Sequence, residues 1–207
     1  MNRTSNHLSS ALDAHNPSRS ERILPFLLTM SLLAAPLMCL AQVPLLVTTF
    51  TNPTPAVPYF GYSAGMVGND KVLISSFPGD MAEGMAYVFR TDGTLLTVYT
   101  NPTPPGGAGN DAFGFAVAPF GADRVLITAY RDGAGASAAG AAYLFDLNGT
   151  VQTTYTNPVP MPLANFGYSI AAVGSDRVLI GVRRDSSSVT NSGLAYLEPV
   201  PKSARIG

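Results

Sequence analysis

The stretch FGYSAGMVGNDKVLIS, residues 60–75, decides the fold because two close copies of it follow in the same chain. The copies are FGFAVAPFGADRVLIT at 113–128 and FGYSIAAVGSDRVLIG at 166–181, so the three stretches begin 53 residues apart. Self-similarity at a fixed period is the signature of a repeat architecture. We therefore expect the chain to be an array of three similar units.

Each unit contains four short runs of residues that are separated by turn signals. The first run alternates with a period of two, and the second (KVLIS, RVLIT or RVLIG) is continuously aliphatic, as in a strand buried on both faces. The third run ends at Asp92-Gly93 or Asn148-Gly149, pairs that favour a two-residue type I′ hairpin, and the fourth run follows. Four strands per unit predict an all-β chain, a β-propeller-like array of three four-stranded antiparallel blades.

The order Phe-Gly-x-Ser, Gly-x-Asp, Val-Leu-Ile-Gly and Gly-x-Ala-Tyr resembles the FG-GAP repeat of integrin α-subunit propellers and of related exported bacterial proteins. The resemblance spans about residues 45–200 and gives repeats at about 60–100, 113–156 and 166–198, followed by a tail at 201–207. It implies one propeller blade per copy and an extracellular binding or adhesion role.

The N-terminal region has the pattern of an export signal. Arg19 and Arg22 precede the apolar run 23–41, which ends in Cys39-Leu40-Ala41, and cleavage is expected before Gln42. Residues 1–41 are thus predicted to be a leader and signal peptide, and residues 42–200 a secreted, periplasmic or cell-surface repeat region without membrane insertion. An uncleaved membrane anchor and a lipid attached at Cys39 are the alternatives.

The composition argues against several kinds of chemistry. A formal net charge of −1 gives no electrostatic reason to expect a nucleic-acid partner. Cleavage before residue 42 would remove the single Cys and both His residues, and with them disulfides, His-based zinc sites and Ser-His-Asp relays. We therefore expect neither an enzyme nor a cofactor.

The turns between the first and second runs lack the calcium loop that many FG-GAP blades carry. Each turn offers one carboxylate, from Asp70, Asp123 or Asp176, whereas Ca²⁺ takes about 6 to 8 oxygen ligands. These three residues are interpreted as turn formers, and no metal is predicted.

The two ends of the repeat region are complementary. Residues 45–52 match the fourth run of a unit, whereas the last unit stops after its third run at Glu198. A terminal strand that completes a blade would cover an exposed edge. The predictions are an open arc, a small ring, or half of a six-bladed homodimer formed by strand exchange; a fragment of a longer array is a further alternative.

The loops between the second and third runs vary while the strands stay alike, as binding loops on a rigid scaffold do. Their charged residues are the candidate ligand-binding residues: Asp80, Arg131, Asp132, Arg184 and Asp185. The alternative for these residues is local turn hydrogen bonding and solvated ion pairs.

Six aromatic residues recur in register and suggest either a platform for sugars or a packed core. They are Tyr87, Tyr143, Tyr196, Phe60, Phe113 and Phe166. Their place inside strands favours the core. The function expected from the sequence is an exported, non-catalytic module that binds an unknown protein or glycan; the alternative is a structural repeat or a truncated array without a ligand of its own.

Overall fold

The computed structural model of this chain describes residues 46–79, 83–103, 111–133, 135–186 and 189–202. The described residues belong to one compact unit, Leu46–Gly207. Within those ranges, no helix has both the length and the apolar character that crossing a membrane requires. The predicted leader and signal peptide at 1–41, and Asp80, lie outside the described residues.

The expectation of an all-β array is confirmed. In the described part of the chain, eleven strands form three antiparallel sheets of four, four and three strands, in each of which consecutive strands pair. The first sheet contains β1 (Phe60–Val67), β2 (Lys71–Ser76), β3 (Met85–Arg90) and β4 (Leu95–Tyr99). The second contains β5 (Phe113–Phe120), β6 (Arg124–Ala129), β7 (Ala141–Asp146) and β8 (Val151–Thr156), and the third contains β9 (Phe166–Val173), β10 (Arg177–Val182) and β11 (Leu194–Pro199).

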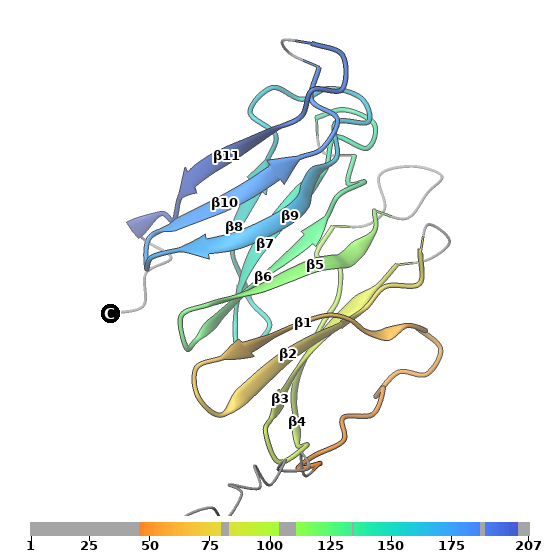
Figure 1. The fold of residues 1–207 in the computed structure, drawn as a ribbon, viewed down its shortest axis with the longest axis vertical. Helices are drawn as coiled ribbons and strands as arrows, with labels where there is room; N and C mark the ends of the chain where they lie inside the picture. Colours follow the sequence, from red (N-terminus) through yellow and green to blue (C-terminus); the bar gives the residue numbers. More distant parts are fainter. Residues whose placement is uncertain (1–45, 80–82, 104–110, 134, 187–188, 203–207) are drawn as a thin grey trace, which may run out of the picture. The chain divides into compact units, whose positions relative to one another are not determined.

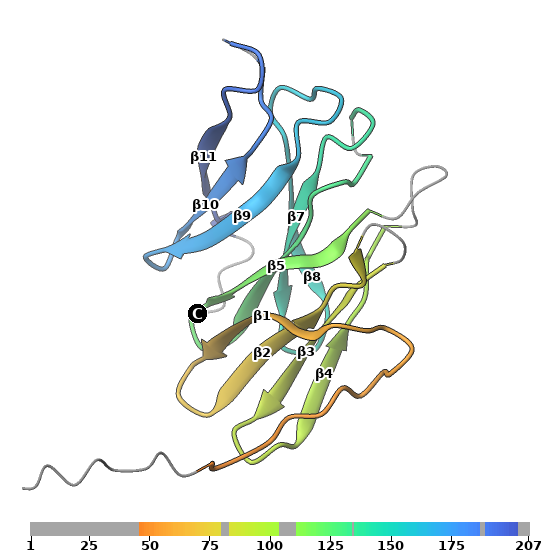
Figure 2. The same ribbon diagram turned by 45° about the vertical axis from the view of Figure 1, so that its right-hand side comes forward.

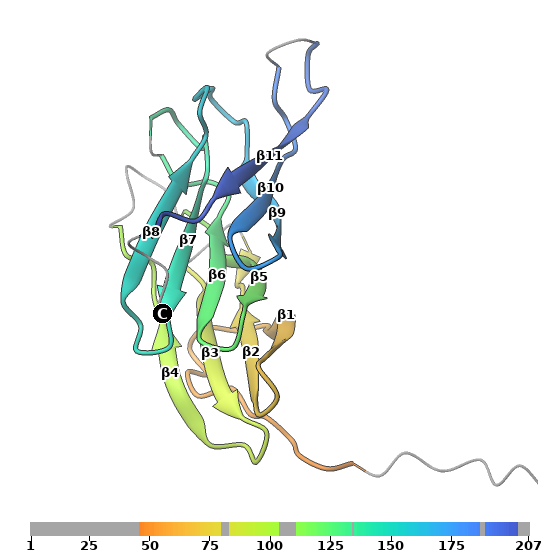
Figure 3. The same cartoon turned by 90° about the vertical axis from the view of Figure 1, so that its left-hand side faces the viewer.

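The three sheets pack side by side as propeller-like blades, with the second sheet between the other two (Figure 1). Their first strands are neighbours, since β5 contacts both β1 and β9. Figure 3 shows the order of β5 to β8 across the second sheet. One apolar cluster joins the first sheet to the second, and another joins the second to the third.

The central aliphatic strand is buried along its whole length in only one sheet. Every residue of β6 is buried, and four of the six residues of β2 are buried. In β10 burial instead alternates, so that Val178 is buried whereas Leu179 is 41% exposed. The prediction of a fully buried strand is therefore wrong for β10, because its sheet has a neighbour on one face alone within the described chain.

The turns between the third and fourth strands are hairpins, but they are not of type I′. Gly93 has φ 95° and Gly149 has φ 89°, whereas Asp92 and Asn148 do not have positive φ. Gly93 N–H donates to the Arg90 carbonyl, and Arg90 N–H donates to the Thr94 carbonyl, which is a three-residue hairpin with a glycine bulge. The Asp92 carboxylate accepts a hydrogen bond from Thr94 N–H at 2.9 Å and stabilises this alternative turn.

Residues 46–52, the described part of the segment predicted to be a strand, have no regular strand in the single chain. They run alongside the first sheet, as the orange ribbon in Figure 2 shows. Phe50 packs against a third apolar cluster, which includes Ile74, Tyr87 and Phe89. Completion of a blade by this segment stays a prediction.

Candidate functional site

The antiparallel order of the strands brings two sets of segments to one edge of the array. In each sheet the loop that follows the second strand lies beside the segment that leads into the first strand, on the right-hand side of Figure 1. We call this side the loop edge. It carries the variable loops 77–84, 130–140 and 183–193, of which residues 80–82, 134 and 187–188 are not described.

Asp132, one of the predicted binding residues, lies inside its loop. Its side chain is 4% exposed. The Asp132 carboxylate accepts hydrogen bonds from the Tyr143 hydroxyl at 2.6 Å and from the Thr103 hydroxyl at 3.0 Å. Burial and the contact with Asp132 raise the pKa of Tyr143 above its usual range, so the hydroxyl stays protonated and acts as the donor. Asp132 therefore holds the loop to the core.

Asp185 occupies the equivalent place in the third unit, and it is fully buried. Its backbone carbonyl accepts hydrogen bonds from Gly193 N–H at 3.1 Å and from the Ser192 hydroxyl at 3.4 Å. Burial, together with the charge of Asp185, raises the pKa of Tyr196. The Asp132 carboxylate and the Asp185 backbone carbonyl thus support the loops from within.

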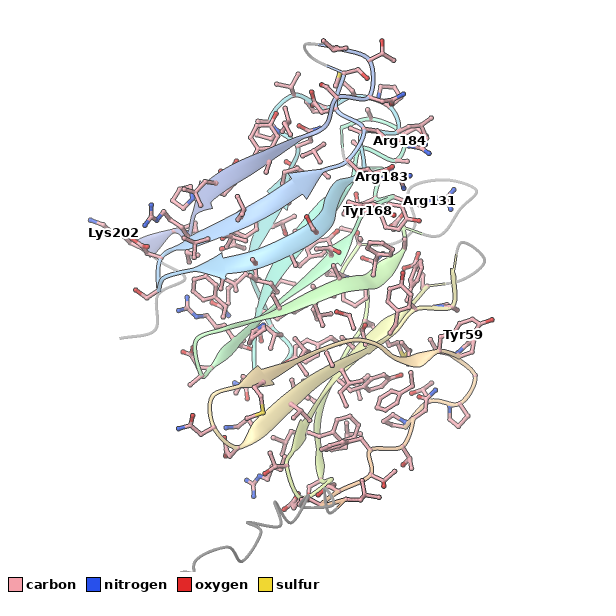
Figure 4. All side chains as sticks on the ribbon, viewed as in Figure 1. Tyr59, Arg131, Tyr168, Arg183, Arg184 and Lys202 are labelled. Carbon is pink, nitrogen blue, oxygen red and sulfur yellow. The ribbon has the colours of Figure 1, made fainter. Side chains whose placement is uncertain are left out.

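The predicted arginines have a different environment. Arg184 is exposed and Arg131 is half-buried. Both extend from the loop edge close to Tyr168, together with Arg183, which the sequence prediction did not include (Figure 4). The structure therefore brings the two predicted arginines to one region, whereas Asp132 and Asp185 are buried.

A row of aromatic rings crosses all three sheets next to this region. It contains the third residue of each Phe-Gly-x motif and the residue that follows β2 and β6: Tyr62, Phe77, Phe115, Tyr130 and Tyr168. Ring centroids lie 5.3 Å apart for Phe77 and Phe115, 4.5 Å for Phe115 and Tyr130, and 5.5 Å for Tyr130 and Tyr168. We call these five residues the aromatic row.

Arg183 continues the aromatic row in the third unit, 53 residues after Tyr130. Its guanidinium carbon lies 4.7 Å from the centroid of the Tyr168 ring, and its Nη1 donates to the Tyr168 hydroxyl at 3.0 Å. A guanidinium over an aromatic face is attracted by the ring quadrupole. Beside this pair lies a shallow depression of about 420 Å³ lined by Tyr168, Ser169, Gly181, Val182, Arg183, Ser192, Gly193 and Leu194.

The aromatic row was absent from the sequence prediction, although a signal for it was present. Tyr62, Phe115 and Tyr168 are spaced by 53 residues, and so are Phe77 and Tyr130. The prediction instead considered the first residue of each Phe-Gly-x motif and the tyrosine of each third run. Tyr87, Tyr143, Phe113 and Phe166 are fully buried or nearly so, and Phe60 and Tyr196 are half-buried, which places this set in the core.

The turns opposite the loop edge contain the three repeated aspartates as pairs with the next residue. Asp70 lies 2.7 Å from Lys71 Nζ, Asp123 lies 3.4 Å from Arg124 Nε, and Asp176 lies 3.5 Å from Arg177 Nε. The hydrogen bond from Lys71 lowers the pKa of Asp70. Within the described ranges, no group of three or more His, Cys, Asp or Glu side chains is placed to hold a metal ion.

These features define an all-β repeat protein built from propeller-like blades. Residues 102–145, which include β5, β6 and all but the last residue of β7, match the family model of the FG-GAP repeat, so the chain contains an FG-GAP repeat at this place. The resemblance inferred from the sequence is thereby confirmed for the second unit. FG-GAP repeat modules are usually non-catalytic. A search of curated proteins found no match to the chain.

Proposed function

We propose that the chain is an exported, non-catalytic binding module, and that its ligand lies along the loop edge, over the aromatic row and Arg183. The observation that carries this proposal is the pairing of Arg183 with Tyr168 beside a depression at the end of the aromatic row. Interface hot spots are enriched in tyrosine and arginine. Export is supported by the apolar run 23–41.

The chemistry of the row favours a protein segment as the ligand over a sugar. Neighbouring rings are tilted to one another, by 88° for Phe77 and Phe115 and by 75° for Tyr130 and Tyr168, so they form no common plane on which a sugar ring would stack. The strip is also uneven, since Tyr62 is 48% exposed, Phe115, Tyr130 and Tyr168 are half-buried and Phe77 is buried. Such a strip suits protruding side chains. Arg183 and Arg184 are exposed, and they would pair with acidic residues of the bound segment.

The test is a selection from a random peptide library, displayed on phage, against residues 42–207, which contain the whole compact unit. We expect enrichment of peptides that combine acidic with aromatic or large aliphatic residues. The Tyr168→Ala and Arg183→Ala variants should each weaken binding of a selected peptide about tenfold, the equivalent of roughly 1.4 kcal/mol. Fluorescence anisotropy with the labelled peptide gives the dissociation constants.

Arg177→Ala is the matched control, because Arg177 begins β10 at the opposite edge and its side chain is 52% exposed. Its affinity should equal that of the unmodified protein. Peptides that bind Tyr168→Ala as tightly as the unmodified protein would refute the site. Binding to a glycan array that is lost in Tyr168→Ala would instead assign the site to a carbohydrate ligand.

A further inference from the structure

Residues 46–52 contact the first sheet in the way that β4 contacts the second sheet. Phe50 packs edge-on against Phe89, with ring centroids 5.4 Å apart and planes at 61°. Tyr99, at the end of β4, packs edge-on against Phe145, with centroids 5.2 Å apart and planes at 68°. The motifs TTFTNP at 48–53 and TVYTNP at 97–102 place Phe50 and Tyr99 at equivalent positions.

Equivalent hydrogen bonds also connect the segment 46–52 to the first sheet and β4 to the second sheet. The Thr48 hydroxyl donates to the Thr91 carbonyl at 2.8 Å, and the Thr97 hydroxyl donates to the Leu147 carbonyl at 2.5 Å. Each of these carbonyls belongs to the turn between the third and fourth strands of its sheet. The segment 46–52 therefore lies where the outer strand of a preceding blade would lie, although among the described residues no other strand of that blade lies beside it.

The third sheet lacks an outer strand in the described chain. Within the described chain, no strand pairs with the outer edge of β11, whereas β3 and β7 pair there with β4 and β8. The sheet also exposes an apolar face, with Leu179 at 41% and Leu197 at 50%. Their equivalents in the second sheet, Leu126 and Leu144, are fully buried against the third sheet.

The space around equivalent glycines also differs between the middle of the array and its two outer surfaces. A Cβ on Gly140, at the start of the third run, would overlap the backbone of Phe166 in the next sheet. Gly193, its equivalent, faces no following sheet of the described chain, and its nearest atoms belong to Val182 and Arg183. At the other end, Gly114 approaches the Met85 carbonyl of the preceding sheet, but Gly61 has no atom within 4 Å of its Cβ position.

We propose that the third sheet of one chain binds the first sheet of a second copy, with residues 46–52 of the second copy pairing along β11. The exposed face of Leu179 and Leu197 then packs on the first sheet, whose Leu95 and Val98 are 40% and 43% exposed. Two copies use the same pair of surfaces twice, and three blades from each chain make one six-bladed ring.

A second copy is the occupant because the two open surfaces are complementary but belong to opposite ends of one chain. The second sheet separates the first sheet from the third, so the surfaces of a single chain do not meet (Figure 1). Six blades fall inside the usual range of about 4 to 8 for propellers, and closure removes the exposed edges. It would also place Arg183 of one copy beside Tyr62 of the other, as Tyr130 lies beside Tyr168.

The test is the solution mass of residues 42–207 by light scattering after size exclusion. We expect a discrete species of twice the chain mass. Leu197→Glu should halve this mass, because it places a charge in the proposed contact. Val159→Glu is the matched control: Val159 is also 50% exposed, but it lies in the connector after β8, and this variant should stay dimeric.

Circular dichroism melting keeps a folding defect of Leu197→Glu distinct from a loss of the contact. A cooperative melt at half the mass supports the proposal. Should the variant unfold, Leu197→Ala, which removes apolar contact without a charge, is expected to weaken the dimer at least tenfold in dissociation constant. Ring closure would be overturned if the unmodified protein were a monomer at every concentration from roughly 1 μM to 100 μM. A series of steadily larger masses, as open-ended association gives, would overturn it too. Ring closure would also cover Gly193 and Leu194, which line the depression of the proposed ligand site. Peptide binding is therefore measured on monomeric Leu197→Glu as well as on the unmodified protein.

Discussion

The second and third sheets share one repeat but differ in what their faces meet. Leu126 in β6 is fully buried, whereas Leu179, at the equivalent place in β10, is 41% exposed. The sequences of the two strands, RVLITA and RVLIGV, are alike in apolar character. The difference therefore comes from the number of neighbouring sheets. In a repeat array, the burial of a strand depends on its position in the array as well as on its sequence.

The same comparison separates residues that support the loops from residues that are available to a ligand. Asp132 and Asp185 are buried in both sheets, although one sheet is enclosed and the other is open. Their burial follows from the turn in which each lies and does not depend on a neighbouring sheet. Arg183 and Arg184 remain at the surface beside Tyr168.

The largest expected difference in stability is between substitutions of the equivalent leucines Leu126 and Leu179. Leu126→Ala should lower the free energy of unfolding by about 2–5 kcal/mol, because it leaves a cavity between two sheets. Leu179→Ala should cost less than about 1 kcal/mol in the dilute single chain, where the side chain already contacts water. Urea unfolding at several protein concentrations measures both. The loss of unfolding free energy caused by Leu179→Ala should rise with protein concentration as rings form. Equal losses for Leu126→Ala and Leu179→Ala in dilute protein would refute the expected difference.

A smaller difference in stability is expected between substitutions of the equivalent tyrosines Tyr143 and Tyr196. Tyr143→Phe should cost about 1–3 kcal/mol at neutral pH, because the buried Asp132 loses a hydrogen bond of 2.6 Å. Tyr196→Phe should cost less, since Tyr196 is half-buried. Thermal melting of both variants tests this order, and the reverse order would contradict the role of Asp132.

The raised pKa of Tyr143 makes the stability of the fold depend on pH, with a sign that follows from the direction of the shift. The pKa of Tyr143 is raised in the folded state, whereas an unfolded tyrosine titrates near pH 10. Its contribution to stability is therefore complete below about pH 10 and is lost as the pH rises toward the folded pKa. Melting temperatures should fall above about pH 10, and they should fall less steeply in Tyr143→Phe.

Much of the fold was predictable from the sequence because the period is regular and the turn residues are specific. The three stretches that begin with Phe60, Phe113 and Phe166 each form the first two strands of a sheet. The hairpin type was not predictable from Asp92-Gly93 alone, because the Asp92 side chain bonds to Thr94 and selects a longer turn. The exposure of Leu179 depends on a missing neighbour, which the local sequence does not encode.

The candidate site was predictable only in part. Charge and loop variability pointed to Arg131 and Arg184, but they could not show that Asp132 turns inward to Tyr143. The aromatic row depends on contacts between sheets, such as that of Phe115 with Tyr168 at 4.8 Å. Those contacts join residues one repeat apart, so only the common spacing of the residues hinted at them.

The two-chain ring is tested most directly by a disulfide between Thr48→Cys and Leu197→Cys in residues 42–207, which lack the native Cys39. Val88 pairs with Thr97 in the first sheet, and Leu144 pairs with Thr153 in the second. By this register Leu197 faces Thr48 of a second copy, within the distance that a disulfide needs. Mild oxidation should give a covalent dimer on a non-reducing gel for the double variant and for neither single variant. A chain that keeps free thiols, or that forms the bond within itself, would contradict the two-chain ring.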